Sequence, residues 1–245
     1  MKPHLIMPMG GAGSRFFKNG YMQPKPLIEI QGKPFLYWAT MSIMKFVEVE
    51  DLTFVVLQKH IDEFQIDKVI KEYFPYARVE VLERILSGPV FTSLRGVERI
   101  TDDAPIIFND CDHMFKCSAI NEILKSGDVD FDGGLLTFES SEPQFSYVVY
   151  NEKHNIIGTI EKKVMSNHAI CGAYIFRSAE LFRSIADEYI NECPYNECFM
   201  SGMYSIMCKK GLKVKDYLLD FHLEFGTPEE YEKAKNSEYF KKISG

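Results

Sequence analysis

The chain has 245 residues, of which 46% are hydrophobic and 26% charged, so it can bury a sizeable core and has the composition of a soluble globular protein. Its formal net charge of −7 argues against a general binder of nucleic acids or membrane surfaces, because either would need a basic face. The first segment, MKPHLIMPMGG, has too short an apolar run for a signal peptide or a membrane span, so we expect a cytoplasmic protein with no nucleic-acid or membrane partner.

Strand-like runs alternate with helix-like patterns along the chain. Runs of β-branched and aromatic residues bounded by turn residues predict strands at 4–9, 52–58, 78–82, 105–109, 133–138, 147–151, 155–160, 169–176 and 212–220. Apolar residues at helical spacing predict helices at 35–46, 61–73, 91–100, 119–124, 179–189 and about 197–209. The early alternation indicates parallel strands joined by crossover helices, and the strand-rich stretch from 133 to 176 indicates added antiparallel strands. Nothing in the composition marks a second domain, so we expect a single domain over 1–245.

The stretch MPMGGAGSRFFKNGYMQPKPL, residues 7–27, follows the first predicted strand and combines glycines with cations. Open α/β sheets bind ligands beyond the carboxyl ends of their strands. Backbone N–H groups of a glycine loop there can surround phosphate oxygens, and cations can add charge, a function that falls to Gly10, Gly11, Gly13, Arg15 and Lys25. A tight strand-to-helix turn with solvated cations is the alternative interpretation.

Two better-known glycine loops fit this stretch badly. A P-loop requires a glycine followed by lysine and then serine or threonine, and the sequence has no such run. A dinucleotide-binding GxGxxG loop would need a third glycine where Phe16 stands. We therefore expect a phosphate-binding loop of another kind.

GGAGSRF followed by PKPLIEIQGKP resembles the signature of the sugar-phosphate nucleotidyltransferases, and further resemblances extend nearly to the carboxyl terminus. That family implies a Rossmann-like αβα sandwich with a mixed, mostly parallel central sheet, similar to GT-A glycosyltransferases. In it the glycine loop wraps a nucleoside triphosphate, the arginine holds the outer phosphates, and the lysine contacts the phosphate under attack. ILSGPVFTSL resembles the segment of that family that lies beneath the nucleotide base. By resemblance, the nucleotide-binding residues are Met9, Gly10, Gly11, Gly13, Ser14, Arg15, Lys25, Gly88 and Asp110, and the catalytic residues are Arg15, Lys25 and Asp112.

The same resemblance implies a metal site. IIFNDCDHMF is similar to the family's strand ending in G-D-x-x-F, whose aspartate binds magnesium, and alignment on Phe115 makes Asp112 that ligand, with Asp110 as its rival. FHLEFGTPEEY is similar to W-x-D-x-G-T-P-E-E, so Glu224 takes the place of the second ligand. The expected cofactor is Mg²⁺, with Mn²⁺ able to substitute. His113 is expected behind the ligands or at the surface, since magnesium prefers oxygen donors.

The end of that second motif also predicts a helix start. In GTPEEY, Thr227 stands at the capping position, Pro228 at the first helical position, and Glu230 three residues after the cap. This is the pattern of a capping box.

The acceptor side departs from the family pattern. GTIEKKVMSNHAICGAYIF is similar to the family's E-K-P and A-G-x-Y-x-F segments, and the implied acceptor-binding residues are Ser146, Tyr147, Glu161, Lys162 and Gly172, with Lys162 available to the acceptor phosphate. Ser146 and Tyr147 stand where sugar enzymes have tyrosine and glycine, and Lys163 replaces the proline. Because those positions usually read a sugar ring, we expect a small phosphorylated acceptor that is not a hexose.

The chain carries no β-helix repeats after GTPEEY, so it resembles the compact subgroup rich in cytidylyltransferases, which implies CTP. Within this subgroup it most resembles the enzymes that use phosphoglutamine in capsular phosphoramidate synthesis, a modification of surface polysaccharide. Phosphocholine and sugar 1-phosphates are alternative acceptors. A glycosyltransferase using Asp110-Cys111-Asp112 as a D-x-D motif, and a silent regulatory module, are alternatives of other classes. The oligomeric state is left open.

Overall fold

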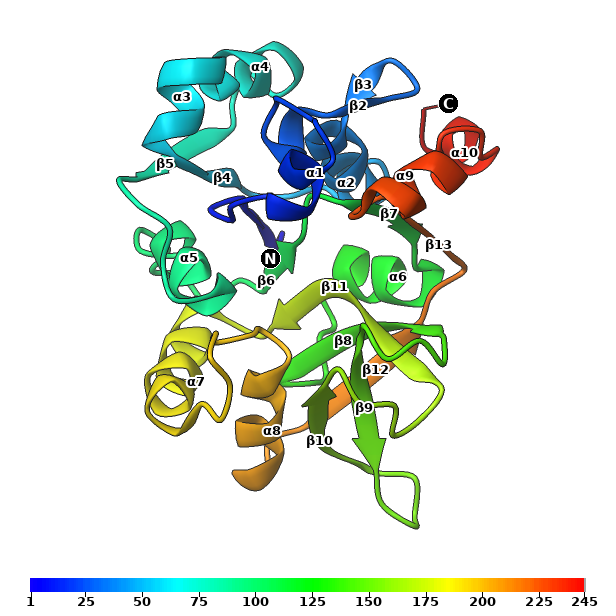
Figure 1. The fold of residues 1–245 in the computed structure, drawn as a ribbon. Helices are drawn as coiled ribbons and strands as arrows, with labels where there is room; N and C mark the ends of the chain where they lie inside the picture. Colours follow the sequence, from blue (N-terminus) through cyan, green and yellow to red (C-terminus); the bar gives the residue numbers. More distant parts are fainter. Residues whose placement is uncertain (245) are drawn as a thin grey trace.

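The computed structural model describes residues 1–244 (Figure 1). Its strands are β1 (His4–Pro8), β2 (Glu29–Ile30), β3 (Lys33–Pro34), β4 (Leu52–Leu57), β5 (Arg78–Leu82), β6 (Ile106–Asn109), β7 (His113–Lys116), β8 (Gly133–Glu139), β9 (Ser146–Tyr150), β10 (Ile156–Glu161), β11 (His168–Phe176), β12 (Val214–Leu218) and β13 (Phe221–Glu224). Its helices are α1 (Ser14–Lys18), α2 (Phe35–Met44), α3 (Gln58–Phe64), α4 (Ile66–Tyr73), α5 (Pro89–Gly96), α6 (Ser118–Ser126), α7 (Ala179–Glu192), α8 (Gly202–Lys209), α9 (Pro228–Ala234) and α10 (Tyr239–Ser244), with a 3₁₀ turn η1 (Lys25–Leu27).

The central sheet follows the order β10-β9-β11-β6-β1-β4-β5, and β8 joins it by pairing with β11 and β12. Strands β5, β4, β1 and β6 are parallel to one another, whereas β11 runs antiparallel to β6, β8 and β9. The predicted α/β class with a mixed central sheet is therefore confirmed, as are the early parallel strands and the antiparallel additions after residue 133. The carboxyl ends of β1 and β6 lie side by side at one edge of the sheet, where ligands are expected.

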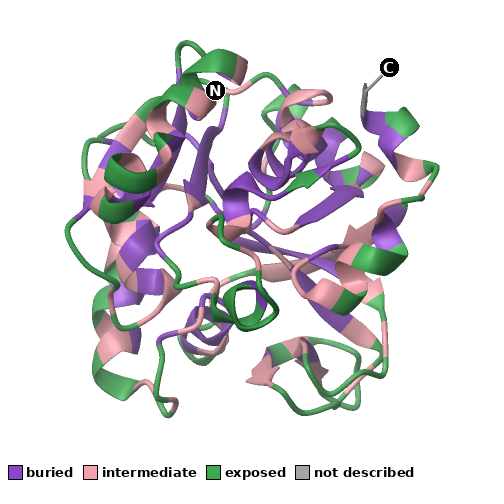
Figure 2. Ribbon diagram, turned by 45° about the horizontal axis from the view of Figure 1, so that its top comes forward, coloured by how far each residue is buried: buried purple, intermediate pink, exposed green. Residues whose placement is uncertain are grey.

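Both faces of the parallel strands are covered. Along β1, Leu5 and Met7 pack with α2, α4 and α6, whereas Ile6 packs with α5, α7 and α8 on the other face. Side chains alternate between the faces of a strand, so a strand buried on both sides reads as one continuous apolar run. Figure 2 shows these strands as buried ribbons between layers of helices. This explains why LIM and FVVL were recognisable as strands.

The elements differ from the sequence-based expectations at several places, of which three bear on the site. The single helix predicted at 61–73 is two helices, because Gln65 adopts a left-handed conformation with φ of 52° between α3 and α4. The helix expected from about residue 197 begins at Gly202. The short strands β7 and β13, which pair antiparallel with Glu224 opposite His113, were not predicted as strands. Each of these strands has only four residues, which is too short for the alternation of apolar and polar side chains to be recognised in the sequence.

No helix within residues 1–244 is both long and apolar enough to cross a membrane. The last two helices pack against α2. Ala234 of α9 and Phe240 of α10, together with Phe225 just before α9, join a third buried cluster with Phe35 and Trp38 of α2. This packing brings β13 and α9 next to the carboxyl ends of the central strands.

The predicted capping box at the start of α9 is confirmed. The Thr227 hydroxyl accepts a hydrogen bond from the Glu230 N–H at 3.2 Å, and the Glu230 carboxylate accepts one from the Thr227 N–H at 2.9 Å. We expect Thr227→Ala to lower the free energy of unfolding by about 1 kcal/mol, because the helix loses its cap. Urea denaturation would measure this, with Thr101→Ala, at an exposed position, as the control. An equal loss in both variants would contradict the capping role.

Candidate active site

The glycine loop follows β1 and forms one wall of a cavity of about 360 Å³. A Cβ atom at Gly10 would lie 2.9 Å from Leu82 Cδ1 and 3.1 Å from Thr92 Oγ1, so a larger residue would collide there. Gly13 has a left-handed φ of 60°, and its carbonyl begins α1. Among the described residues, nothing lies within 4 Å of a Cβ placed at Gly11, so that position faces open space. The loop thus leaves its backbone accessible to a ligand.

Most of the predicted nucleotide-binding residues line this smaller cavity: Met9, Gly10, Gly11, Gly13, Ser14, Lys25, Gly88 and Asp110. Arg15 does not. It is exposed and lines a larger neighbouring cavity of about 710 Å³ instead.

Gly88, which lines the smaller cavity, lets the loop before α5 pack closely against the segment before α8. Its φ is 126°, and a Cβ atom there would lie 2.6 Å from the Cys198 nitrogen. The Cys198 N–H donates to the Ser87 carbonyl at 3.1 Å, and the Val90 N–H donates to the Cys198 carbonyl at 3.2 Å. The segment before α8 is therefore fastened to the loop before α5. This fastening brings Glu197, which sequence reasoning missed, to the wall of both cavities.

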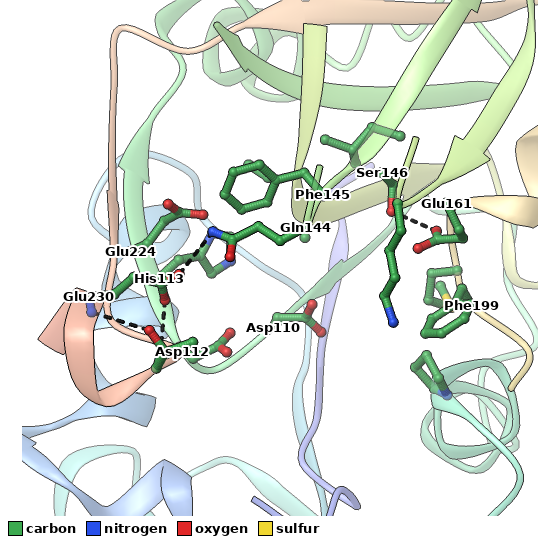
Figure 3. Close-up of a pocket in the computed structure, with 18 of the residues that line it drawn as sticks. Asp110, Asp112, His113, Gln144, Phe145, Ser146, Glu161, Phe199, Glu224 and Glu230 are labelled. Carbon is green, nitrogen blue, oxygen red and sulfur yellow. Dashed lines mark hydrogen bonds between the residues drawn. The ribbon is translucent and has the colours of Figure 1, made fainter. Parts of the chain in front are cut away.

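The larger cavity gathers side chains from elements far apart in the sequence (Figure 3). Of the predicted residues, it is lined by Arg15, Asp110, Asp112, Ser146, Glu161, Lys162, Gly172 and Glu224. Figure 3 shows Asp110 between the group around Asp112 and the group around Glu161 and Phe199. Asp110 also lines the smaller cavity, so it marks the point where the two meet.

An ion pair stands at this junction. Lys25 Nζ lies 2.7 Å from Asp112 Oδ2, and the two side chains are only 29% and 24% exposed. Burial opposes the charge of each partner, but the attraction between the two charges outweighs it. The pKa of Lys25 is therefore raised, and the pKa of Asp112 is lowered by Lys25 and by the nearby His113 and Arg15. Both groups are therefore ionised at neutral pH. Burial, followed by the charge of Asp112, raises the pKa of Asp110.

Asp112 and Glu224 are brought together by the pairing of β7 with β13. The Phe225 N–H donates to the Asp112 carbonyl at 3.0 Å, and a Cβ atom at Gly226 would overlap the Asp112 carboxylate. Burial, and then the neighbouring Glu230, Asp112 and Glu142, raise the pKa of Glu224 to about 8. Carboxylates crowded in this way are relieved by a cation.

This oxygen donor set fits Mg²⁺, which takes one or two carboxylates and completes its shell with waters and phosphate oxygens. Within the described part of the chain, no three His, Cys, Asp or Glu side chains are arranged as a closed metal site. His113 also lines the larger cavity but is only 3% exposed, and desolvation lowers its pKa to about 4. Asp112 and Glu224 are the residues that would hold the ion.

The acceptor-side residues form a second group at the other end of the larger cavity. Glu161 Oε1 accepts hydrogen bonds from the Ser146 hydroxyl at 2.6 Å and from the Ser201 hydroxyl. Lys162 has a left-handed φ of 51°, and its Nζ lies 5.4 Å from the centre of the Phe199 ring. Gly172 has a φ of 87°, and a Cβ atom there would lie 2.8 Å from Asp110 Oδ2. Gly172 thus makes room for Asp110.

The structure does not bring Tyr147 to the cavity, which corrects its assignment as an acceptor-binding residue. Its side chain is fully buried, and its hydroxyl donates to the Glu142 carbonyl at 2.6 Å. Ser146 and Tyr147 are neighbours on β9, so they face opposite sides of the sheet, and only Ser146 lines the cavity. Lys163 is exposed and does not line the cavity either.

Sequence reasoning also missed several lining residues: Gln144, Phe145, Glu197, Phe199, His222 and Glu230. Phe199 and Glu197 lie in an irregular segment without a motif. The sequence analysis assigned Glu230 only to the helix cap. His222 stood within the FHLEFGTPEEY motif but was given no role. The available signal was proximity in sequence to a predicted residue, which was Ser146 for Gln144 and Phe145 and Glu224 for His222 and Glu230.

Comparison with known proteins gives one family and a consistent fold. A family model described as Nucleotidyl transferase matches residues 4–239. No curated protein matches the chain. A nucleoside-diphosphate-sugar pyrophosphorylase from Vibrio cholerae RC9 is 22% identical, with a TM-score of 0.82 over 95% of this chain and 100% of that one. An inositol-1-phosphate CTP transferase from T. maritima is 18% identical, with a TM-score of 0.75 over 100% of this chain and 95% of that one. A putative glucose-1-phosphate thymidylyltransferase from Bacillus anthracis is 15% identical, with a TM-score of 0.76 over the full length of both chains.

Proposed function

Because the chain belongs to the nucleotidyl transferase family, we propose that it transfers CMP from CTP to a small phosphorylated acceptor and releases pyrophosphate. The observation that carries this proposal is the Lys25–Asp112 ion pair at the junction of the two cavities. One cavity lies against the glycine loop and the other against Lys162, so an acceptor in the larger cavity can reach the α-phosphorus of a nucleotide held in the smaller one. The family match over 4–239 supports one catalytic domain in residues 1–245.

The chemistry follows from charge. An oxygen of the acceptor phosphate attacks the α-phosphorus in line, a new P–O bond forms, and the bond to the β-phosphate oxygen breaks. The acceptor oxygen is already ionised near neutral pH, so no side chain has to act as a base. Lys25 offsets charge on the α-phosphoryl oxygens, the glycine-loop N–H groups hold phosphate oxygens, and Arg15 meets the outer phosphates. Mg²⁺ held by Asp112 and Glu224 would neutralise further phosphate charge.

The acceptor is proposed from the charge of its cavity. Six carboxylates line the larger cavity, against two cations, Arg15 and Lys162. Asp112 and Glu224 are assigned to the metal, Glu230 caps α9, and burial disfavours ionisation of Asp110, so Glu161 and Glu197 are the carboxylates available to an ammonium group. A phosphorylated amino acid brings such a group, whereas an uncharged sugar does not. Phosphoglutamine is therefore our first candidate, and a role in modifying surface polysaccharide goes with it.

Two other acceptors remain as alternatives. Phosphocholine also carries a cation, and the Phe199 and Phe145 rings lie in the cavity that would receive it. A sugar 1-phosphate is favoured only by the names of similar structures, such as the pyrophosphorylase from Vibrio cholerae. A glycosyltransferase using the D-x-D motif is disfavoured because the chain carries the GGAGSRF and PKPL segments and belongs to the nucleotidyl transferase family.

Pyrophosphate release tests the proposal directly. Each of the four common nucleoside triphosphates would be combined with phosphoglutamine, phosphocholine and glucose 1-phosphate in the presence of Mg²⁺. We expect the highest kcat/KM with CTP and phosphoglutamine. A kcat/KM for glucose 1-phosphate equal to or above that for the two cationic acceptors would contradict the acceptor assignment while leaving nucleotidyl transfer intact.

Lys162→Ala should raise the KM of the acceptor by about 10-fold or more, because a hydrogen bond to a charged phosphate is lost. The KM of CTP should change little, since Lys162 does not line the smaller cavity. Steady-state kinetics with each substrate varied in turn would measure both constants. Lys163→Ala is the matched control, since Lys163 is exposed and outside the cavity. An equal effect of the two variants would remove Lys162 from the acceptor site.

A further inference from the structure

We propose that a hydrogen-bonded chain of three side chains, Asn109, His113 and His222, positions the two carboxylates that would hold the metal. This inference rests on the proposed function, because it assigns a role to residues next to Asp112 and Glu224. None of the three residues is needed as a ligand or as a base.

The chain runs across three strands. Asn109 Nδ2 donates to the Ala39 carbonyl of α2 at 2.9 Å. His113 Nε2 lies 2.9 Å from Asn109 Oδ1, and His113 Nδ1 lies 3.1 Å from His222 Nε2. Asn109 and His113 are 0% and 3% exposed, so these bonds are shielded from water. The ends of β6, β7 and β13 are thereby connected through side chains.

The bond from Asn109 to Ala39 decides the direction of the others. Since the amide nitrogen is the donor to Ala39, Oδ1 of Asn109 must accept, and His113 carries its proton on Nε2. A His113 ring that carries its one proton on Nε2 has a lone pair on Nδ1, so Nδ1 accepts a hydrogen bond from His222 Nε2–H. The geometry thus assigns the Nε2–H tautomer to both histidines.

The chain controls the distance between the two carboxylates. His113 directly follows Asp112 and begins β7, and it pairs in register with Glu224 on β13. His222 precedes Glu224 by two residues, so the two side chains share one face of β13 and line the same cavity. The Phe138 ring, whose centre lies 4.2 Å from that of His222, holds the imidazole from the other side. A shift of His222 would therefore carry Glu224 away from Asp112.

Nuclear magnetic resonance on the unmodified protein tests the chain itself. Long-range ¹H–¹⁵N correlations report which ring nitrogen carries the proton. We expect both His113 and His222 as Nε2–H tautomers, and His222→Phe should identify one set of signals by removing it. An Nδ1–H tautomer or a doubly protonated ring at His113 would overturn the proposal, and this result does not depend on any activity.

Mn²⁺ binding tests the positioning role. Electron paramagnetic resonance would measure the affinity for Mn²⁺, alone and with CTP, in the unmodified protein, His222→Phe and His222→Gln. We expect His222→Phe to weaken Mn²⁺ binding by about 10-fold or more, as for residues that orient metal ligands. His222→Gln, which retains an N–H donor at the position of Nε2, should restore most of the affinity. His60→Phe, at a buried histidine on α3, should change nothing.

The outcomes separate the two proposals. Equal affinities for His222→Phe and the unmodified protein, or an equal loss in His222→Phe and His222→Gln, would overturn the positioning role. An unmodified protein that binds no Mn²⁺, even with CTP, would overturn the metal site of the proposed function, and this inference with it.

Discussion

Asp112→Asn should abolish most of the activity, with a loss in kcat of about 10³-fold, because a metal ion contributes several kcal/mol to the stabilisation of the transition state. The substitution keeps the shape of the side chain but removes its charge, and so removes both the expected metal ligand and the partner of Lys25. The unmodified enzyme should likewise lose activity in EDTA and recover it with Mg²⁺ or Mn²⁺. Steady-state assays at varied Mg²⁺ concentration would measure these effects.

The control is Asp110→Asn, two residues away, whose side chain lines the larger cavity together with Asp112 and also lines the smaller one. Burial and the charge of Asp112 already disfavour ionisation of Asp110, so neutralising it should cost much less activity. If Asp110→Asn were the more damaging change, the assignment of Asp112 as the ligand would be wrong.

Lys25→Ala should lower kcat by about 10²-fold or more, as expected when one group that stabilises developing charge is removed. Lys25 is the cation that lines the glycine-loop cavity, and its amine lies beside Asp112 at the junction with the acceptor cavity. Its pKa is raised by Asp112, so it keeps its charge throughout the neutral range. Single-turnover and steady-state rates at saturating CTP would show whether the chemical step is affected.

Two further variants serve as comparisons for Lys25→Ala. Arg15→Ala, which removes the cation expected on the outer phosphates, should raise the KM of CTP as well as lower kcat. Lys18→Ala removes an exposed cation on α1 that lines neither of the two substrate cavities, so its kinetics should be normal. Near-normal kcat in Lys25→Ala, with circular dichroism showing a folded protein, would exclude Lys25 from the mechanism.

Some features of this protein were determined by sequence over a short range. The buried strands could be predicted because their residues pack on both faces, and this gives runs such as FVVL in β4. The capping box at Thr227 and Glu230 could be predicted because all its hydrogen bonds form within four residues. The glycine loop could be recognised from its run of glycines, and Gly13 meets a local need because it adopts a left-handed conformation. The need for glycine at position 10 comes instead from the distant Leu82 and Thr92 side chains.

Other features were decided only by tertiary structure, because they depend on which distant segments pair. Lys25 and Asp112 are 87 residues apart in sequence, and His113 and His222 are 109 apart. The pairing of β7 with β13 places Glu224 opposite His113, and neither four-residue strand reveals its register alone. For Tyr147, the motif identified the position in the sequence but not the direction in which the side chain points. Side chains alternate along β9, so the Tyr147 ring lies in the core and Ser146 faces the cavity.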